Sequence, residues 1–310
     1  MRTVIGVVIL MALVAVRSSS AEPRVEKNIV YGMFSGSALL LDIHRPEKPN
    51  GYGVIHVGGS GWHASLAYDA LPLKESQIGI WGPPLLRAGY TVFSINHRAA
   101  PAFRYPAAVE DVQRAVRFIR HNARLLGVEP TRLGGMGGSS GGHLLGLVAM
   151  LRAPGIADDP DPVNREPATL ETVVLRAGKF DMARRPVPGA TASFMGLIPN
   201  NAVAQKVYAA ASPITHVSAG APPVLLLHGD SDDVVPFEES VEMEKALRAA
   251  NVAVKLVRIP GGEHGEDFGA QGKPNPSWPD YYGEMVAWFD QHLKTTATGV
   301  ATAPPTAGRD

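Results

Sequence analysis

Residues 132–151 read RLGGMGGSSGGHLLGLVAML, a strand-like segment that passes through a glycine-rich turn into an apolar helix. The turn contains the pattern G-x-S-x-G twice, once centred on Ser139 and once on Ser140. This pattern, between a strand and a helix, is typical of a strained turn that presents a nucleophilic serine at its apex. A phosphate-binding loop would end in Lys-Ser or Lys-Thr, and the spacing of a dinucleotide fingerprint is also absent. The turn therefore predicts a nucleophilic serine, and its own sequence fits both candidates.

Strand-length apolar runs alternate with helical patterns on both sides of this turn. The apolarity within each run is continuous, which is typical of strands that are covered on both faces in a parallel sheet. Alternation of strand and helix predicts an α/β fold with a mostly parallel central sheet and helices on both faces. Ligands bind such sheets beyond the carboxyl ends of the strands. The predicted strands are 52–59, 90–96, 132–138, 170–178, 222–230 and 252–261, and two predicted helices cover 108–119, with Gly127 as the stop, and 282–293.

The two ends of the chain differ from the rest. Residues 1–21 combine Arg2, an apolar stretch too short to span a bilayer comfortably and small residues before Ala21, which predicts a secretory signal peptide. An uncleaved membrane anchor is the alternative. Residues 294–310 are small and polar with prolines, which predicts a disordered tail. We expect one catalytic domain over residues 22–293, secreted or periplasmic, without stable membrane insertion after cleavage of the signal.

Composition excludes several classes of function. The chain has 310 residues, with 29 basic and 29 acidic side chains, so no charge excess favours nucleic acid as a partner. It has no cysteine, which excludes disulfides, thiolate zinc sites and a cysteine nucleophile.

The region around the serine turn resembles a known family. The stretch from NHRAAPAFRYPAAVEDVQ at residue 96 to GMGGSSGGHLLGLVA is similar to α/β-hydrolase esterases of the feruloyl-esterase-like and hormone-sensitive-lipase-like groups. Motifs in the family order extend over roughly residues 30–290. The resemblance implies the α/β-hydrolase fold and places the nucleophile at Ser139, with Ser140 in the position of the family's usual alanine.

A nucleophilic serine needs a histidine base and a carboxylate that orients it. Residues 222–236, PPVLLLHGDSDDVVP, offer three carboxylates, Asp230, Asp232 and Asp233. The family pattern H-G-x-x-D-x-x-V-P implies Asp232 as the acid and leaves the other two as solvated turn residues. RIPGGEHGEDF, residues 258–268, implies His264 as the base, in the chain order Ser, acid, His that this fold uses.

Backbone amides must stabilise the negative charge that develops during attack. The early turn IHVGGSGWHAS, residues 55–65, resembles the family's H-G-G-G-W and implies amide donors at Ser60 and Gly61, with a further donor at Ser140. Aligned on Trp62, Gly58 stands at the family's histidine position and His56 lies two residues earlier.

Three residues in family positions are expected to support the site. Arg98 and Asp111 are expected to form an internal ion pair, and His143 to pack or form hydrogen bonds near the serine.

These residues predict a serine hydrolase that cleaves carboxylic esters through an acyl-enzyme, without metal or cofactor. A peptidase or amidase of the same fold, resembling prolyl oligopeptidases, is the alternative, and a non-catalytic binding protein is a further one. Residues 29–46 read as a hairpin with FSGS as its turn, which leaves little chain before the core for a cap. The expected substrates are therefore short-chain esters of carbohydrates or other bulky alcohols.

Overall fold

The computed structural model describes residues 24–184, 189–196, 201–269, 275 and 277–294. Its centre is an eight-stranded sheet in the order β1-β2-β4-β3-β5-β6-β7-β8. β1 and β4 both run antiparallel to β2, whereas every neighbouring pair from β4 to β8 is parallel. This confirms the predicted mostly parallel sheet. The strands are β1 (Arg24–Phe34), β2 (Ser37–Arg45), β3 (Gly53–Val57), β4 (Thr91–Ile95), β5 (Leu133–Gly138), β6 (Thr172–Arg176), β7 (Val224–Gly229) and β8 (Val254–Ile259).

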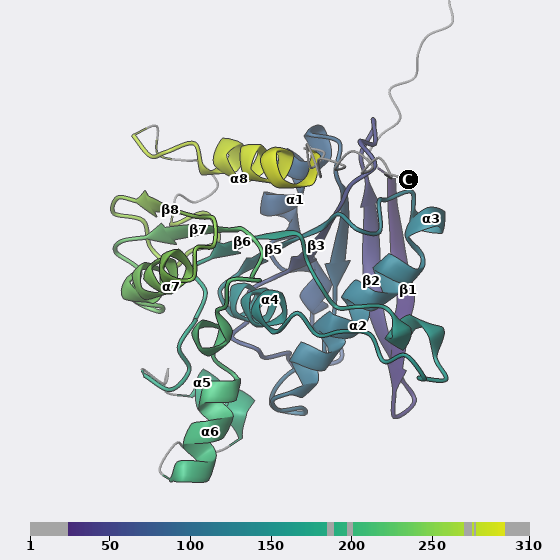
Figure 1. The fold of residues 1–310 in the computed structure, drawn as a ribbon, viewed down its shortest axis with the longest axis horizontal. Coiled ribbons are helices and arrows are strands. Elements are labelled where there is room, and N and C mark those ends of the chain that lie inside the picture. The colour runs from purple at the N-terminus through teal and green to yellow at the C-terminus, as the bar shows by residue number, and fades with distance from the viewer. Residues whose placement is uncertain (1–23, 185–188, 197–200, 270–274, 276, 295–310) are drawn as a thin grey trace, which may run out of the picture.

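Helices cover both faces of the sheet (Figure 1). Apolar side chains of α2, α4 and α7 join one buried cluster, and those of α1 and α8 join another on the opposite face. The strands contribute to both clusters because successive side chains point to opposite faces. The helices are α1 (Ile78–Arg87), α2 (Ala107–His121), α3 (Ala123–Leu126), α4 (Ser140–Leu151), α5 (Ala190–Met195), α6 (Ala202–Ala210), α7 (Glu238–Ala249) and α8 (Tyr281–Phe289).

The first two strands form a hairpin. β1 and β2 pair through a tight turn at Ser35 and Gly36, which both have positive φ, so the predicted hairpin is confirmed.

The helix expected to continue to Gly127 instead breaks after His121. There the Asn122 backbone leaves the helical region, with φ −96° and ψ 11°, and its side-chain amide donates to the Phe118 carbonyl at 2.8 Å.

The connection between β6 and β7 is the longest excursion from the sheet. It carries α5, α6 and a short 3₁₀ turn at Pro213–His216, and Figure 1 shows α5 and α6 standing away from the sheet beyond α4. The N-terminal part of the described chain forms the β1–β2 hairpin, and no cap helix is formed from it.

The predicted signal segment, residues 1–21, lies outside the described residues, as does the predicted tail apart from Lys294. No helix in the described ranges has the length and apolar character needed to cross a bilayer.

Strand order brings the sequence motifs to one edge of the sheet. The serine turn follows β5, and the glycine-rich turn at residues 58–61 follows the neighbouring β3. The acidic turn follows β7, and the segment with His264 follows β8. All four strands are parallel, so their carboxyl ends lie at the same edge, where α/β sheets bind ligands.

His56 is a buried polar residue on β3 that the sheet does not satisfy. It is 1% exposed, and neither ring nitrogen has a hydrogen-bond partner among the residues described. Burial, with a smaller contribution from nearby His44, lowers the pKa of His56 from 6.5 to about 3. The imidazole is therefore neutral in the folded protein at neutral pH.

Replacing His56 by leucine is expected to stabilise the protein and to flatten the pH dependence of its stability. An unsatisfied buried polar group costs about 1–3 kcal/mol, which the variant recovers. Because the folded-state pKa is depressed, the unfolded chain binds more protons between about pH 6.5 and 3. This histidine therefore lowers the free energy of unfolding as the pH falls through that window, by up to ~1.4 kcal/mol per pH unit.

Urea unfolding of wild type and His56→Leu at pH 7 and pH 5 measures both effects. A variant that is less stable at pH 7, with the pH dependence of the wild type, contradicts this account of β3.

Candidate active site

Ser139 sits at the apex of a strained turn between β5 and α4. Its backbone has φ 52° and ψ −121°, a conformation that a residue with a Cβ adopts only where the surroundings impose it. The turn is crowded, since a Cβ on Gly141 would lie 2.0 Å from the Val57 carbonyl oxygen. Ser140, by contrast, is the first residue of α4 and is 2% exposed. The structure thus gives the two serines different positions, with Ser139 at the apex.

A chain of hydrogen bonds links three of the residues predicted from the sequence. The distance from Ser139 Oγ to His264 Nε2 is 2.9 Å, and that from His264 Nδ1 to Asp232 Oδ2 is 2.7 Å. With Nδ1–H donating to the carboxylate, Nε2 is free to accept the serine proton. Three loops that are distant in the sequence therefore meet in the arrangement that activates a serine.

Asp232 is buried and tightly held. Its Oδ1 accepts hydrogen bonds from the amides of Val234 and Val235 at 2.9 and 2.8 Å. Burial alone would raise its pKa, but hydrogen bonds from His228 and His264, with that from the Val235 amide, hold the pKa of Asp232 well below its usual range. The carboxylate is therefore ionised across the neutral range and available to orient the imidazole.

The other two carboxylates of the turn do not reach His264. Asp233 is exposed to solvent, as expected. Asp230 was expected to be solvated as well, but it is engaged: its Oδ1 accepts from the Gly261 amide and its Oδ2 from Arg258 Nε, both at 2.6 Å. Asp230 therefore ties the acidic turn to the end of β8.

His228 supports the acid from beneath and was not assigned a role from the sequence. This fully buried residue of β7 accepts from the Ser240 hydroxyl at Nδ1, 2.7 Å away. Its Nε2 lies 2.9 Å from the Val235 carbonyl and 3.3 Å from Asp232 Oδ2. The histidine of the H-G-x-x-D pattern was the available signal for this contact.

Arg176 supports the base, and no motif in the sequence marks it. This fully buried side chain at the end of β6 donates from Nη2 to the carbonyl of His264 at 2.6 Å and to that of Gly265. Its guanidinium also lies 4.9 Å from the centre of the Phe268 ring. Burial lowers the pKa of Arg176 to about 10, so it remains a cation. Arg176 thus fixes the backbone of the segment that carries the histidine.

The turn after β3 lies against the serine turn. The Gly59 amide donates to Gln77 Oε1 at 3.0 Å, and the Ser60 amide donates to the Ser140 hydroxyl at 2.9 Å. Within the described chain the amides of Gly61 and Ser140 have no hydrogen-bond partner. Of the three predicted amide donors, two are free and that of Ser60 is already engaged.

Gly58, at the family's histidine position, has no room for a side chain. A Cβ there would come 2.4 Å from the Ser76 carbonyl oxygen. His56 does not take the place of the missing histidine, because its buried side chain belongs to β3 and neither ring nitrogen has a hydrogen-bond partner among the described residues.

His143 links this turn to the excursion between β6 and β7. Trp62 Nε1 donates to His143 Nδ1 at 2.9 Å, and His143 Nε2 donates to the Ala211 carbonyl at 2.8 Å. Phe194 of α5 stacks on Trp62 at 5.1 Å between ring centres. Burial lowers the pKa of His143 to about 4, so it is neutral and serves as a hydrogen-bonding residue, as predicted.

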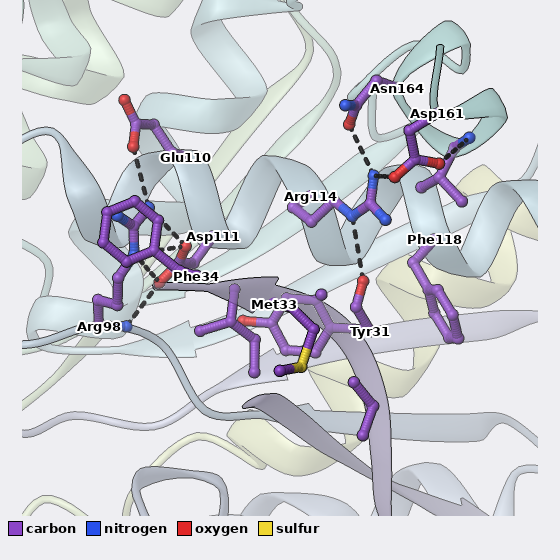
Figure 2. Close-up of a pocket in the computed structure, with 14 residues that line it drawn as sticks. Tyr31, Met33, Phe34, Arg98, Glu110, Asp111, Arg114, Phe118, Asp161 and Asn164 are labelled. Atoms are coloured by element: carbon purple, nitrogen blue, oxygen red, sulfur yellow. Dashed lines mark hydrogen bonds and ion pairs between the residues drawn. The ribbon is translucent and has the colours of Figure 1, made fainter. Parts of the chain in front are cut away.

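Arg98 and Asp111 form the predicted ion pair, shown in Figure 2. Arg98 Nε lies 2.9 and 3.0 Å from the two carboxylate oxygens of Asp111, and the Arg98 guanidinium stacks on Phe34. The loop that follows is joined to the serine site, since the Ala100 amide donates to the Trp62 carbonyl.

A cavity of about 530 Å³ lies beside this pair, between β1 and α2. The two arginines that line it already have partners. Arg114 donates to the Tyr31 carbonyl and to Asn164 Oδ1 and pairs with Asp161, while Arg98 pairs with Asp111. Among the residues described, no group of three or more potential ligand side chains is arranged to hold a metal ion.

Comparison with known proteins adds independent findings. A family model described as BD-FAE matches residues 41–247. The chain is 29% identical over 257 residues to Esterase LipC of Mycobacterium tuberculosis, covering 78% of this chain and 60% of LipC. It is 24% identical over 260 residues to acetylxylan esterase of Xylanibacter ruminicola, covering 81% of this chain and 47% of that protein. The chain thus spans only about half to three fifths of the length of these relatives.

A solved structure described as a truncated form of carbohydrate esterase from gut microbiota has the same fold. It superposes with a TM-score of 0.72 at 26% identity, covering 90% of this chain and 99% of that chain.

The geometry predicts which acidic residue activates Ser139. Asp232→Asn should slow the reaction of Ser139 with a fluorophosphonate by several orders of magnitude, up to about 10⁴-fold, because the imidazole loses its orientation and its preferred tautomer. Asp233→Asn, which alters an exposed side chain of the same turn, is the matched control and should label at nearly the wild-type rate.

Labelling rates are followed by mass spectrometry of the peptide that contains residues 134–151. A loss at Asp233→Asn as large as that at Asp232→Asn contradicts the assignment.

Proposed function

The chain belongs to the BD-FAE family, and from that premise we propose that it is a serine carboxylesterase. The observation that carries the proposal is the continuous hydrogen-bonded chain from Ser139 through His264 to Asp232. These three residues lie in loops at the carboxyl edge of the sheet, where α/β sheets bind ligands. The esterase relatives support the reaction class.

In the first half of the reaction, Ser139 Oγ attacks the ester carbonyl while His264 Nε2 takes the hydroxyl proton. Asp232 stabilises the imidazolium and keeps Nδ1–H pointed away from the serine. The carbonyl oxygen becomes an oxyanion. The amides of Gly61 and Ser140, which have no hydrogen-bond partner among the described residues, are available to donate to it. The proton on Nε2 then passes to the leaving alkoxide as the C–O bond breaks, which leaves an acyl group on Ser139.

In the second half, water attacks the acyl carbonyl and His264 removes its proton. Collapse of the second tetrahedral intermediate returns that proton to Ser139 Oγ and releases the carboxylic acid. Donors that are held in fixed positions stabilise both intermediates without reorganising during the reaction. The supports described above, Arg176 beneath the His264 loop and His228 beneath Asp232, serve this fixed geometry.

We propose that the substrates are short-chain acyl esters of bulky alcohols such as carbohydrates. Two relatives are described as a carbohydrate esterase and an acetylxylan esterase, and these descriptions support that alcohol class. The described N-terminal residues form a hairpin, so they supply no cap to enclose a long acyl chain. We further propose that the enzyme works in the periplasm or outside the cell, on the basis of the signal pattern in residues 1–21.

A series of nitrophenyl esters tests the reaction and the chain-length preference together. We expect kcat/KM to peak between acetyl and butyryl and to drop well before dodecanoyl. An enclosed acyl site would gain roughly 0.8 kcal/mol for each methylene removed from water, and an open site forfeits that gain. Ser139→Ala should abolish turnover of every ester in the series, and a short-chain nitroanilide should be cleaved far more slowly than the matching ester.

An optimum at long chains with activation at a lipid interface would instead point to a lipase. Faster cleavage of the anilide than of the ester would point to an amidase or peptidase, and turnover that survives Ser139→Ala would remove the proposed nucleophile.

A further inference from the structure

The side chain of Ser140 lies between the two turns of the proposed active site. Its hydroxyl oxygen accepts the hydrogen bond from the Ser60 amide at 2.9 Å. A Cβ added to Gly59 would lie 3.0 Å from the Ser139 Cβ, which shows how closely the turn after β3 passes the nucleophile. The Ser140 hydroxyl is therefore next to the place where the oxyanion forms, on the residue directly after the nucleophile.

The hydroxyl proton of Ser140 has no acceptor within the described residues. Ser140 is 2% exposed, and the bond from Ser60 uses its oxygen only as an acceptor. A buried hydroxyl that cannot donate is unfavourable, and buried polar groups normally find partners. The free donor and the adjacent catalytic serine together indicate that an acceptor arrives with the substrate.

Both residues of this contact depart from the family pattern described above. Ser140 replaces the usual alanine after the nucleophile, and Ser60 replaces a glycine of the H-G-G-G-W motif. In the structure the two departures touch each other. The Ser60 amide is engaged by the Ser140 hydroxyl, and that hydroxyl keeps a proton to donate.

We propose that the Ser140 hydroxyl is a side-chain donor to the oxyanion, oriented by the Ser60 amide. The hydrogen bonds run from the Ser60 N–H to the Ser140 oxygen, and from the Ser140 O–H to the oxyanion. No covalent bond changes and no proton is transferred along this chain. Donation to an anion strengthens the second bond, and the amide polarises the hydroxyl further. Ser140 then contributes both its amide and its hydroxyl, and Ser60 is a positioning residue.

This inference rests on the proposed esterase function, and its test separates the two. Ser140→Ala is compared with wild type on nitrophenyl acetate and on nitrophenyl thionoacetate, in which sulfur replaces the carbonyl oxygen. Sulfur is a weak hydrogen-bond acceptor, so removal of a donor that binds this atom costs less on the thionoester. Active sites are counted by fluorophosphonate labelling, so any misfolded fraction does not enter kcat. Ser140→Gly, which also lacks the hydroxyl, provides a second variant.

We expect both variants to lose about 10²-fold in kcat on the oxygen ester, with KM little changed, and to lose far less on the thionoester. Ser218→Ala, which removes an exposed hydroxyl on another loop, serves as the control and should match wild type on both substrates. An equal loss of kcat on the two substrates would mean that the hydroxyl only holds the turn in place. An unchanged or higher kcat would mean that the hydroxyl competes for the Ser60 amide. Either result overturns the inference. Absence of turnover by wild type would overturn the esterase function itself.

Discussion

The close approach of backbone segments at the Ser139 turn is the constraint on which the rest of the site depends. Ser139 holds φ 52° and ψ −121°, and Gly141 leaves no space for a side chain against Val57. A strained turn of this kind persists only where neighbouring structure determines it from several sides. Here β5, α4 and the turn after β3 determine the conformation of the turn, and together they place Ser139 at the carboxyl edge of the sheet.

The buried polar groups around this turn form hydrogen bonds that hold the loops of the site in place. Arg176 holds the carbonyls of the His264 segment, and His228 lies under Asp232. His143 connects Trp62, directly after the glycine-rich turn, to the Ala211 carbonyl in the excursion between β6 and β7. Each support acts on a loop at the carboxyl edge, where backbone would otherwise be mobile. Electrostatic stabilisation of an oxyanion requires hydrogen-bond donors that are already held in place before the reaction.

The parts of this architecture that were predictable from the sequence are those with a local signal. Continuous apolar runs located the strands, and glycine spacing located the serine turn, because both depend on neighbours in the chain. The break at Asn122 was missed because it lies in the backbone angles of that one residue, for which the periodicity of apolar residues gives no signal. The role of Arg176 depends on how β6 lies beside a segment almost ninety residues away, and the engagement of the Ser60 amide depends on a contact across eighty residues. No local pattern carries such information.

Direct capture of the acyl-enzyme tests the central claim, that Ser139 is the nucleophile of an ester hydrolase. Rapid mixing with nitrophenyl acetate, followed by acid quench and mass spectrometry of the peptides, locates the acetyl group while the released nitrophenol is measured in parallel. The account predicts an initial burst of nitrophenol matched by an equal amount of acetyl on Ser139. Acetyl on Ser140, or turnover with no acetyl on either serine under conditions where deacylation is slow, would contradict it.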